Sequence, residues 1–367
     1  MLGLALLSCA LGLVSIAGAS GNSLSDPLVA YLVKRQMLSF AIGGVALVVF
    51  AVSDYHFWAS WWRVIYGGAL LLLVAVMVIG HHSLGAQRWI RVGPFDLQPS
   101  ELSKLAMVIC LAAILSSQSG KLRTYRDMVL PTVAIAVPAV LVVLQPDLGT
   151  SLVFIAILAG MAFAAGFPGY KVLLAAVLSV GSAVALVVAH LHWPHYVPLP
   201  LHRYQLARLT AFINPQAHAQ TTGYQVVQSE MAVGSGRLFG NGLFSGGVGG
   251  QLTYMPENNT DFVFSSIADT MGFVGGVAVV LVLALIVWRV LTCMMLARDT
   301  TGALLAAGVA CMLGFETLLN VGVTLGLMPV TGVPLPFTSY GGSSAMVSLA
   351  SVGLVQSIYA RRKPIRF

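Results

Sequence analysis

The sequence contains very few charged residues. Of its 367 residues, 19 are Lys or Arg and 12 are Asp or Glu, so only 8% are charged, whereas 58% are hydrophobic. A soluble domain carries about 25% charged residues, which keep its surface hydrated. The composition therefore excludes a soluble enzyme, a disordered chain and a coiled coil. It predicts an all-α polytopic membrane protein.

Cysteine is scarce as well. The four cysteines, Cys9, Cys110, Cys293 and Cys311, all lie in apolar stretches and none has a CxxC spacing. We expect small apolar packing groups rather than a disulfide or a thiolate metal site. The formal net charge of +7 does not indicate a nucleic-acid partner. In a membrane protein, an excess of Lys and Arg is explained more simply as a topology signal.

Ten apolar segments are candidates to cross a bilayer, whose core of about 30 Å requires roughly 20 helical residues. The first segment has no basic region before it, because the first Lys or Arg is Lys34. We therefore expect a retained helix there rather than a signal peptide. The chain 1–367 is expected to form a single transmembrane domain, with a large loop at 192–261 between the seventh and eighth spans. The segments are 1–18, 37–53, 64–80, 102–116, 128–144, 149–166, 171–191, 272–296, 302–323 and 342–360.

The basic residues predict the orientation of these spans. With ten spans both termini lie on one side, and eleven Lys and Arg residues near span ends fall on that side, against five on the other. Loops rich in Lys and Arg face the cytoplasm. We therefore expect cytoplasmic termini and an extracytoplasmic loop at 192–261. The eleven are Arg63, Lys121, Arg123, Arg126, Lys171, Arg289, Arg298, Arg361, Arg362, Lys363 and Arg366.

Two shorter outer segments contain candidate site residues. Segment 81–104 is expected to be a loop that ends in a helix, with Ser100 as its N-cap. Glu101 and Lys104 are three residues apart, so they share one helical face at the entrance of a span. Ionisable residues at membrane depth are functional by default. Asp147, in the turn QPDLGT, either caps the sixth span or faces the same cavity as this pair.

The long outer loop ends at Asp261, where the chain returns to the membrane. A half-buried carboxylate at this position is suited to act as a base, although capping of the next helix is the alternative. Glycines recur on both sides of Ser235, at 234, 236, 240 and 242, and their backbone amides are candidates for binding an anion. The apolar segment 328–344 is expected to lie in the interface or to fold into an outer cavity. Together these features suggest an outward cleft for a lipid-linked substrate that bears a phosphate.

Five segments resemble the SEDS family (shape, elongation, division and sporulation), whose members polymerise peptidoglycan. They occur in the family's order, and the segments PVTGVPLPFTSYGG and QLTYMPENNTDF are most similar to its elongation branch. The segments are GAQRWIRVGPFDLQPSELSKL (85–105), QPDLGTSLV (145–153), TGYQVVQSEMAVGSGRLFGNGL (222–243), MPENNTDFVFS (255–265) and LPFTSYGGSS (335–344).

The resemblance implies an inverting glycosyltransferase that joins lipid II to a glycan carried on undecaprenyl diphosphate. Asp261 matches the aspartate regarded as the family's catalytic base, and Glu101, Lys104 and Asp147 match residues that line its cavity. A divalent cation, Mg²⁺ or Mn²⁺, is compatible with this chemistry, but no ligand set is evident in the sequence. The expected protein partner is a class B penicillin-binding protein, a transpeptidase with one membrane helix. As contacts for the diphosphate we select Arg88, Arg91 and Lys104, with Arg203 and Arg208 behind them.

The chain departs from the family's sequence pattern at one place, and two alternative functions are open. After TDFVFS the family usually has a Gly-Glu-Glu-like run, where this chain has Asp269 and Thr270. The first alternative function is a lipid II flippase or another transporter of lipid-linked substrates, with Glu316 as a coupling site. The second is a scaffold for partner enzymes.

Overall fold

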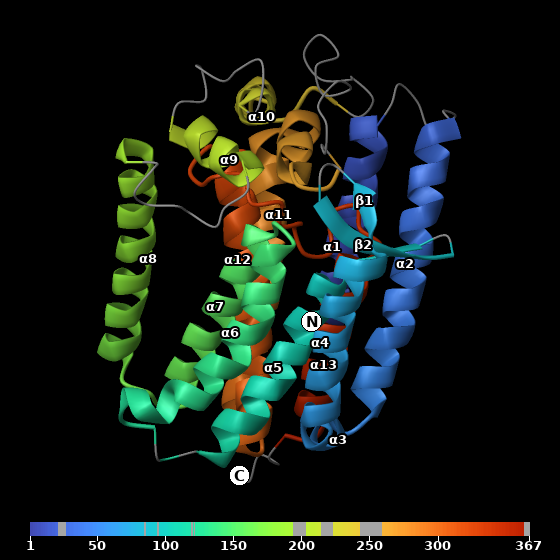
Figure 1. Cartoon of the computed structure of the whole chain (residues 1–367). Helices are drawn as coiled ribbons and strands as arrows, with labels where there is room; N and C mark the ends of the chain where they lie inside the picture. Colours follow the sequence, from blue (N-terminus) through green and yellow to red (C-terminus); the bar gives the residue numbers. More distant parts are fainter. Residues whose placement is uncertain are drawn as a thin grey trace.

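The computed structural model describes residues 1–20, 27–83, 86–93, 95–118, 120, 122–193, 203–213, 223–242 and 259–362. The chain folds into a bundle of long helices whose axes run in roughly one direction (Figure 1). We call the end that carries α9 and α10 the α10 end, and the end that carries α3 the α3 end. The helices are α1 (Leu2–Ser20), α2 (Pro27–Val52), α3 (Tyr55–Ser60), α4 (Trp62–Ile79), α5 (Pro99–Ser117), the 3-10 helix η1 (Tyr125–Met128), α6 (Val129–Leu144), α7 (Leu148–Ala164), α8 (Gly169–His192), α9 (Arg203–Ile213), α10 (Tyr224–Ser235), α11 (Val263–Leu296), α12 (Thr300–Thr324) and α13 (Gly342–Ala360).

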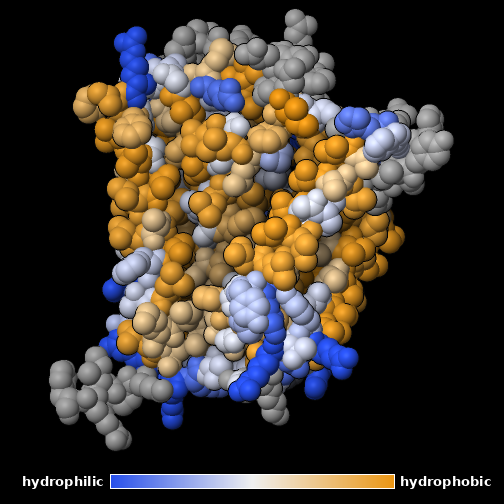
Figure 2. All heavy atoms as spheres, turned by 90° about the vertical axis from the view of Figure 1, so that its left-hand side faces the viewer, coloured by the Kyte–Doolittle hydropathy of each residue, from blue (hydrophilic) through white to orange (hydrophobic). Residues whose placement is uncertain are grey.

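The all-α membrane architecture expected from the composition is confirmed. Among the described residues, eight helices are long and apolar enough to cross a bilayer, and two shorter apolar helices, Leu2–Gly18 and Leu148–Ala164, complete the ten expected segments. Apolar side chains cover the middle of the face in Figure 2, and hydrophilic ones gather at both ends. This distribution is the one required of a surface that contacts lipid in the middle and water at the ends.

Three of the long spans are buried far more than the others. In α5 and α13, 78% of the most apolar 18-residue window is buried, and in α12 the share is 67%, whereas in α8 it is zero. α12 packs closely against α5 and α7 at Gly308, where an added β-carbon would lie 2.7 Å from both Val108 Cγ1 and Met161 Sδ. Small residues allow such close approach of helices in membranes. The central helices therefore form a rigid support for the loops at the α10 end.

Segment 81–104 is more ordered than the loop predicted there. It forms a small antiparallel sheet of three strands, β1 (His81–Ser83), β2 (Ala86–Val92) and β3 (Phe95–Leu97). The expectation that Ser100 caps the following helix is wrong. Gln98 occupies the N-cap of α5, and Pro99 takes the first helical position, where its fixed φ and missing N–H are tolerated.

α11 bends at Gly272, so the eighth apolar span begins at the kink. Gly272 has φ 69° and ψ −169°, a conformation that only glycine adopts readily. The amides of Phe273 and Val274, which the kink releases from the helix, donate to the carbonyls of Arg237 and Leu238 at 2.8 and 3.1 Å. The segment after α10 therefore completes the backbone hydrogen bonds that the kink interrupts.

Candidate active site at the α10 end

Asp261 lies in the turn before α11, and this turn is held from three sides. The three successive carbonyls of residues 259–261 each accept a hydrogen bond from a donor between residues 320 and 340. Such contacts leave the backbone around the carboxylate little freedom to move. The donors are Tyr340 N to Asn259 O at 2.8 Å, Ser339 Oγ to Thr260 O at 2.7 Å and Asn320 Nδ2 to Asp261 O at 2.9 Å.

The carboxylate of Asp261 and the guanidinium of Arg208, on α9, lie close to the same residue, Gly332. A β-carbon added at Gly332 would lie 3.4 Å from Asp261 Oδ2 and 3.6 Å from Arg208 Nη1. Arg208 Nη1 also donates to Val330 O at 3.3 Å. The structure therefore brings together two of the residues selected from the sequence, one carboxylate and one guanidinium, against the segment 330–332.

Segment 328–344 folds inward, the second of the two expectations for it. Leu335, Phe337 and Thr338 are buried, and burial raises the pKa of the Tyr340 phenol. This buried segment supplies one wall of the Asp261 site.

A buried group of three charges includes Glu316 of α12, the helix whose Asn320 bonds to the Asp261 turn. Lys104 Nζ donates to Glu101 Oε1 at 2.8 Å and also to Glu316 Oε1, and all three side chains are at most 4% exposed. Glu316 precedes Asn320 on α12 by four residues, which is one helical turn and about 6 Å along the axis. α12 thus connects the Asp261 turn with the Glu101–Lys104 pair. Lys104, enclosed by two glutamates, makes no contact with solvent in this conformation.

Asp147 caps α7, the first of the two roles left open for it. Its Oδ1 accepts from Thr150 N at 3.2 Å, and its Oδ2 accepts from Thr150 Oγ1 at 2.9 Å. Ser100 Oγ and Gln98 Nε2 donate to the same Oδ2 at 3.2 and 3.3 Å. The carboxylate is 2% exposed, so Asp147 joins the start of α5 to the start of α7.

The remaining arginines have different surroundings. Arg88 donates to the carbonyls of Gln145, at 2.8 Å, and Pro146, so its guanidinium attaches the sheet to the α6–α7 turn. Arg91 is exposed and lies 3.5 Å from Asp96. Arg203 is the first residue of α9, but its side chain lies outside the described residues. The described contacts thus give Arg88 a structural role. Of these arginines, they place only Arg208 against the Asp261 turn.

Ser235 and the segment after it are bonded to α11 next to its kink. Ser235 Oγ and Asn241 Nδ2 both donate to Asp269 Oδ1 at 2.7 Å, and the amides of Asn241 and Gly242 donate to the carbonyls of Asp269 and Thr270. The expectation that the amides of this segment are available to an anion is therefore wrong for Gly240, Asn241 and Gly242, because each is bonded to protein. Asp269 fastens the segment 235–242 to α11.

The described residues do not fit a divalent cation held by protein ligands. Among them no group of three or more His, Cys, Asp or Glu side chains is placed to bind one ion. Glu101 and Glu316 both face the Lys104 ammonium, and the carboxylate of Asp147 already accepts hydrogen bonds from protein donors. We therefore derive no step through a metal.

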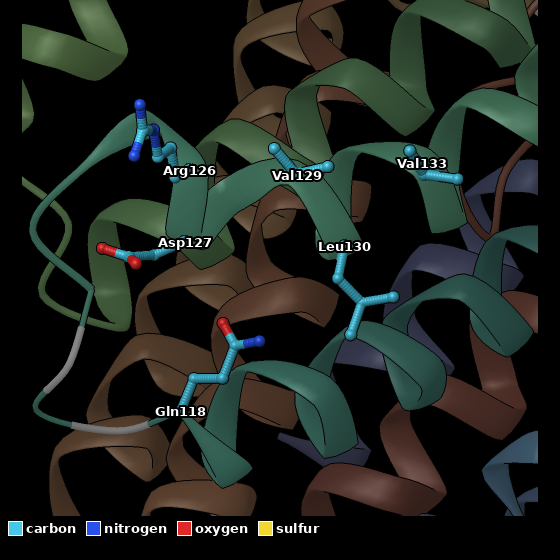
Figure 3. A pocket seen from close by; sticks show the side chains of 6 residues that line it. All are labelled: Gln118, Arg126, Asp127, Val129, Leu130 and Val133. Carbon is cyan, nitrogen blue, oxygen red and sulfur yellow. The ribbon is translucent and has the colours of Figure 1, made fainter.

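A pocket of about 540 Å³ lies at the α3 end, between the end of α5 and the start of α6 (Figure 3). It contains none of the predicted site residues, and Gln118 points from α5 toward α6 across it. The pocket therefore lies away from the candidate site, which is at the α10 end. The pocket is lined by Gln118, Arg126, Asp127, Val129, Leu130 and Val133.

The sequence reasoning missed three residues of the site. Glu316 was noted only as a possible coupling residue of a transporter, and Asn320 and Ser339 were not selected at all. Glu316 and Asn320 are four residues apart in an apolar span, a spacing that places them on one helical face. That spacing was the available signal.

The fold agrees with comparisons to known proteins. The chain belongs to the FtsW/RodA/SpoVE family of cell cycle proteins, whose model matches residues 1–364. It is 36% identical over 336 residues to a probable peptidoglycan glycosyltransferase FtsW of Geobacter sp. (strain M18), covering 91% of this chain and 88% of that protein. It is 34% identical over 339 residues to the peptidoglycan glycosyltransferase MrdB of Escherichia coli (strain K12), covering 90% and 86%.

Two solved structures have the same fold. One, described as showing the structural coordination of polymerization and crosslinking by a peptidoglycan synthase complex, matches with a TM-score of 0.80 at 30% identity, over 98% of this chain and 96% of that chain. The other is a mutant of the rod shape determining protein RodA of Thermus thermophilus, with a TM-score of 0.70 at 28% identity, over 99% and 97%. The multi-pass architecture is therefore that of a known family of membrane proteins.

Proposed function

We propose that this chain is a peptidoglycan glycosyltransferase that polymerises lipid II into glycan strands, with Asp261 as general base. The observation that carries the proposal is the placement of Asp261. Its carboxylate lies beside Arg208, on a turn held at three successive carbonyls, and one of the donors, Asn320, lies on the helix that carries Glu316 of the buried ionic group. The names of the FtsW and MrdB relatives support the same reaction.

In the proposed reaction, Asp261 takes the proton from the 4-hydroxyl of the acceptor GlcNAc of lipid II. The oxygen attacks the anomeric carbon of the growing glycan from the face opposite its undecaprenyl diphosphate, so the α-linkage is inverted to a β-1,4 bond. Negative charge develops on the departing diphosphate. Arg208 is placed to stabilise that charge, because a guanidinium presents two parallel N–H donors to phosphate oxygens.

The buried ionic group would hold the site in place from deeper within the helix bundle. Lys104 neutralises part of the charge of two glutamates and joins α5 to α12, so the helix that holds the Asp261 turn has a fixed position. Charged groups this deep in a membrane are functional by default. Their role here is to maintain the geometry and the electrostatic potential under Asp261.

We place the protein in the bacterial cytoplasmic membrane, with its termini in the cytoplasm and the α10 end outside. The excess of basic residues at the α3 end supports this orientation. The sequence segments 251–262 and 329–342 favour the elongation role of a RodA-type protein, in which a class B penicillin-binding protein is the partner. Similarity to a structure from a peptidoglycan synthase complex supports such a partner.

The test is polymerisation of purified lipid II by the protein and its transpeptidase partner, comparing wild type with Asp261→Asn. This substitution keeps the size of the side chain and removes the base. Asp127→Asn is the matched control, because it makes the same chemical change at the α3 end. We expect long strands from wild type and from the control, and none from Asp261→Asn.

Equal strands from all three proteins would contradict the catalytic role of Asp261. A lipid II flippase is the alternative, since a buried ionic group across two spans also suits a transporter. Movement of fluorescent lipid II between leaflets, without strands from any of the three, would favour that alternative.

A further inference from the structure

The side chain of Asn320 links the two backbone segments that enclose the Asp261 carboxylate. Its Nδ2 donates to Asp261 O at 2.9 Å and to Val333 O at 2.9 Å. Val333 follows Gly332, the residue whose backbone abuts Asp261 Oδ2. One amide group therefore fixes both the residue that carries the carboxylate and the wall that the carboxylate faces.

The chemistry of this position requires an amide. A carboxamide nitrogen carries two donors in one plane, and each of them satisfies one carbonyl. Asn320 is 1% exposed, so no water replaces these donors if they are lost. Leucine has a similar volume but no donor, and an ionised aspartate would turn an acceptor toward two carbonyl oxygens.

Asn320 also belongs to one of the buried helices. It lies on α12, whose other contacts include the ion pair with Lys104 one turn earlier, and its carbonyl accepts from Thr324 Oγ1 at 3.1 Å. The Asn320 side chain therefore connects α12 to the catalytic turn by hydrogen bonds, alongside the apolar cluster that contains Val323 and Phe262. Ser339 Oγ helps from the other side, because it donates to Thr260 O and accepts from Leu335 N.

We infer that Asn320 is a positioning residue for the glycosyl transfer, which sets the distance and direction of Asp261 toward the acceptor hydroxyl without touching substrate. The inference rests on the proposed role of Asp261. A base displaced by about 1 Å loses roughly a hundredfold in rate, whereas binding of the lipid and sugar groups elsewhere is unaffected. A change at Asn320 therefore lowers kcat and leaves KM close to its original value.

The experiment compares Asn320→Leu with Thr317→Val in the lipid II assay with the partner present. Thr317 lies three residues earlier on α12, and among the described residues its hydroxyl bonds only within its own helix, to Leu313 O at 2.8 Å. We expect Asn320→Leu to lower kcat by about tenfold to a hundredfold with KM within about twofold, and Thr317→Val to behave as wild type. Hydrogen exchange measured by mass spectrometry should become faster in residues 259–265 and remain slow in α5.

The inference is overturned if Asn320→Leu matches Thr317→Val in kcat, or if exchange rises throughout the bundle together with the loss of activity. Asn320→Ala, which leaves room for a water donor, replaces the leucine variant if that protein does not fold. Unfolding of both variants would assign Asn320 to stability alone. A fully active Asp261→Asn in the same assay would overturn the proposed function as well, whereas an inactive one beside a normal Asn320→Leu would overturn only this inference.

Discussion

Lys104 of α5 and Glu316 of α12 form an ion pair across two core helices, although 212 residues separate them in the chain. Both side chains are at most 4% exposed. Since Lys104 is also bonded to Glu101, one ammonium serves two carboxylates. Loss of the ammonium therefore affects two carboxylates, whereas loss of one carboxylate leaves the ammonium paired with the other.

We expect Lys104→Met to be far more damaging than Glu316→Gln. Removing the lysine leaves two buried carboxylates without a cation, which costs about 3–5 kcal/mol of the free energy of unfolding. Removing Glu316's charge leaves a neutral pair of Lys104 and Glu101, so the cost should be about 1 kcal/mol. Thermal unfolding in detergent would measure both. Equal melting temperatures for the two variants would contradict the shared-ammonium arrangement.

Arg208→Gln should lower the rate of glycan polymerisation. The guanidinium lies against the Asp261 turn, and its loss removes a cation placed to stabilise the departing diphosphate. A donor of this kind contributes roughly a hundredfold to a thousandfold in kcat. The rate of strand formation from lipid II is the measurement, and Arg126→Gln, the same change at the α3 end, is the control. If both variants polymerise at the wild-type rate, Arg208 has no part in the reaction.

Asp269→Ala should release the segment 235–242 from α11. It leaves Ser235 Oγ and Asn241 Nδ2 without their acceptor, which we expect to cost about 1–3 kcal/mol locally. Asp269→Asn keeps an oxygen in place and should be milder. Hydrogen exchange of residues 235–242 would show the difference. Identical exchange in the two variants would mean that Asp269 does not hold this segment.

Gly272→Ala should destabilise the protein strongly. Its φ of 69° is unfavourable for alanine, and the added β-carbon would lie 2.3 Å from Gly240 N and 2.5 Å from Leu238 O. Gly67→Ala in α4 is the control, since a β-carbon there meets nothing within 4 Å. We expect a lower melting temperature only for the first variant. A melting temperature unchanged by Gly272→Ala would show that the kink relaxes without cost.

Local patterns were enough to predict the membrane helices and part of the site. A span has to be apolar over a length fixed by the bilayer, so ten segments could be located by hydropathy alone. The pairing of Glu101 with Lys104 follows from helical spacing, and a carboxylate before an apolar run was a good candidate for the cap that Asp147 provides.

Predictions failed where a partner distant in sequence decides the structure. The glycines around Ser235 have the composition of an anion-binding loop, yet the amide of Gly242 bonds to Thr270 O of α11 and that of Gly240 bonds to Gly236 O. Two of the three strands of segment 81–104 have only three residues, too few to give a periodic pattern. Arg88 was selected as a phosphate ligand, but its described contacts are two backbone carbonyls of the α6–α7 turn.

The sequence by itself determined the class of protein, the number of spans and the identity of most charged residues at the site, because hydropathy and helical spacing are local properties. Only the tertiary structure decided which of those residues meet. Helix packing brought Glu316 to Lys104, and it brought the Asn320 amide to the Asp261 backbone. The strength of these contacts depends on their burial, which no local sequence pattern specifies.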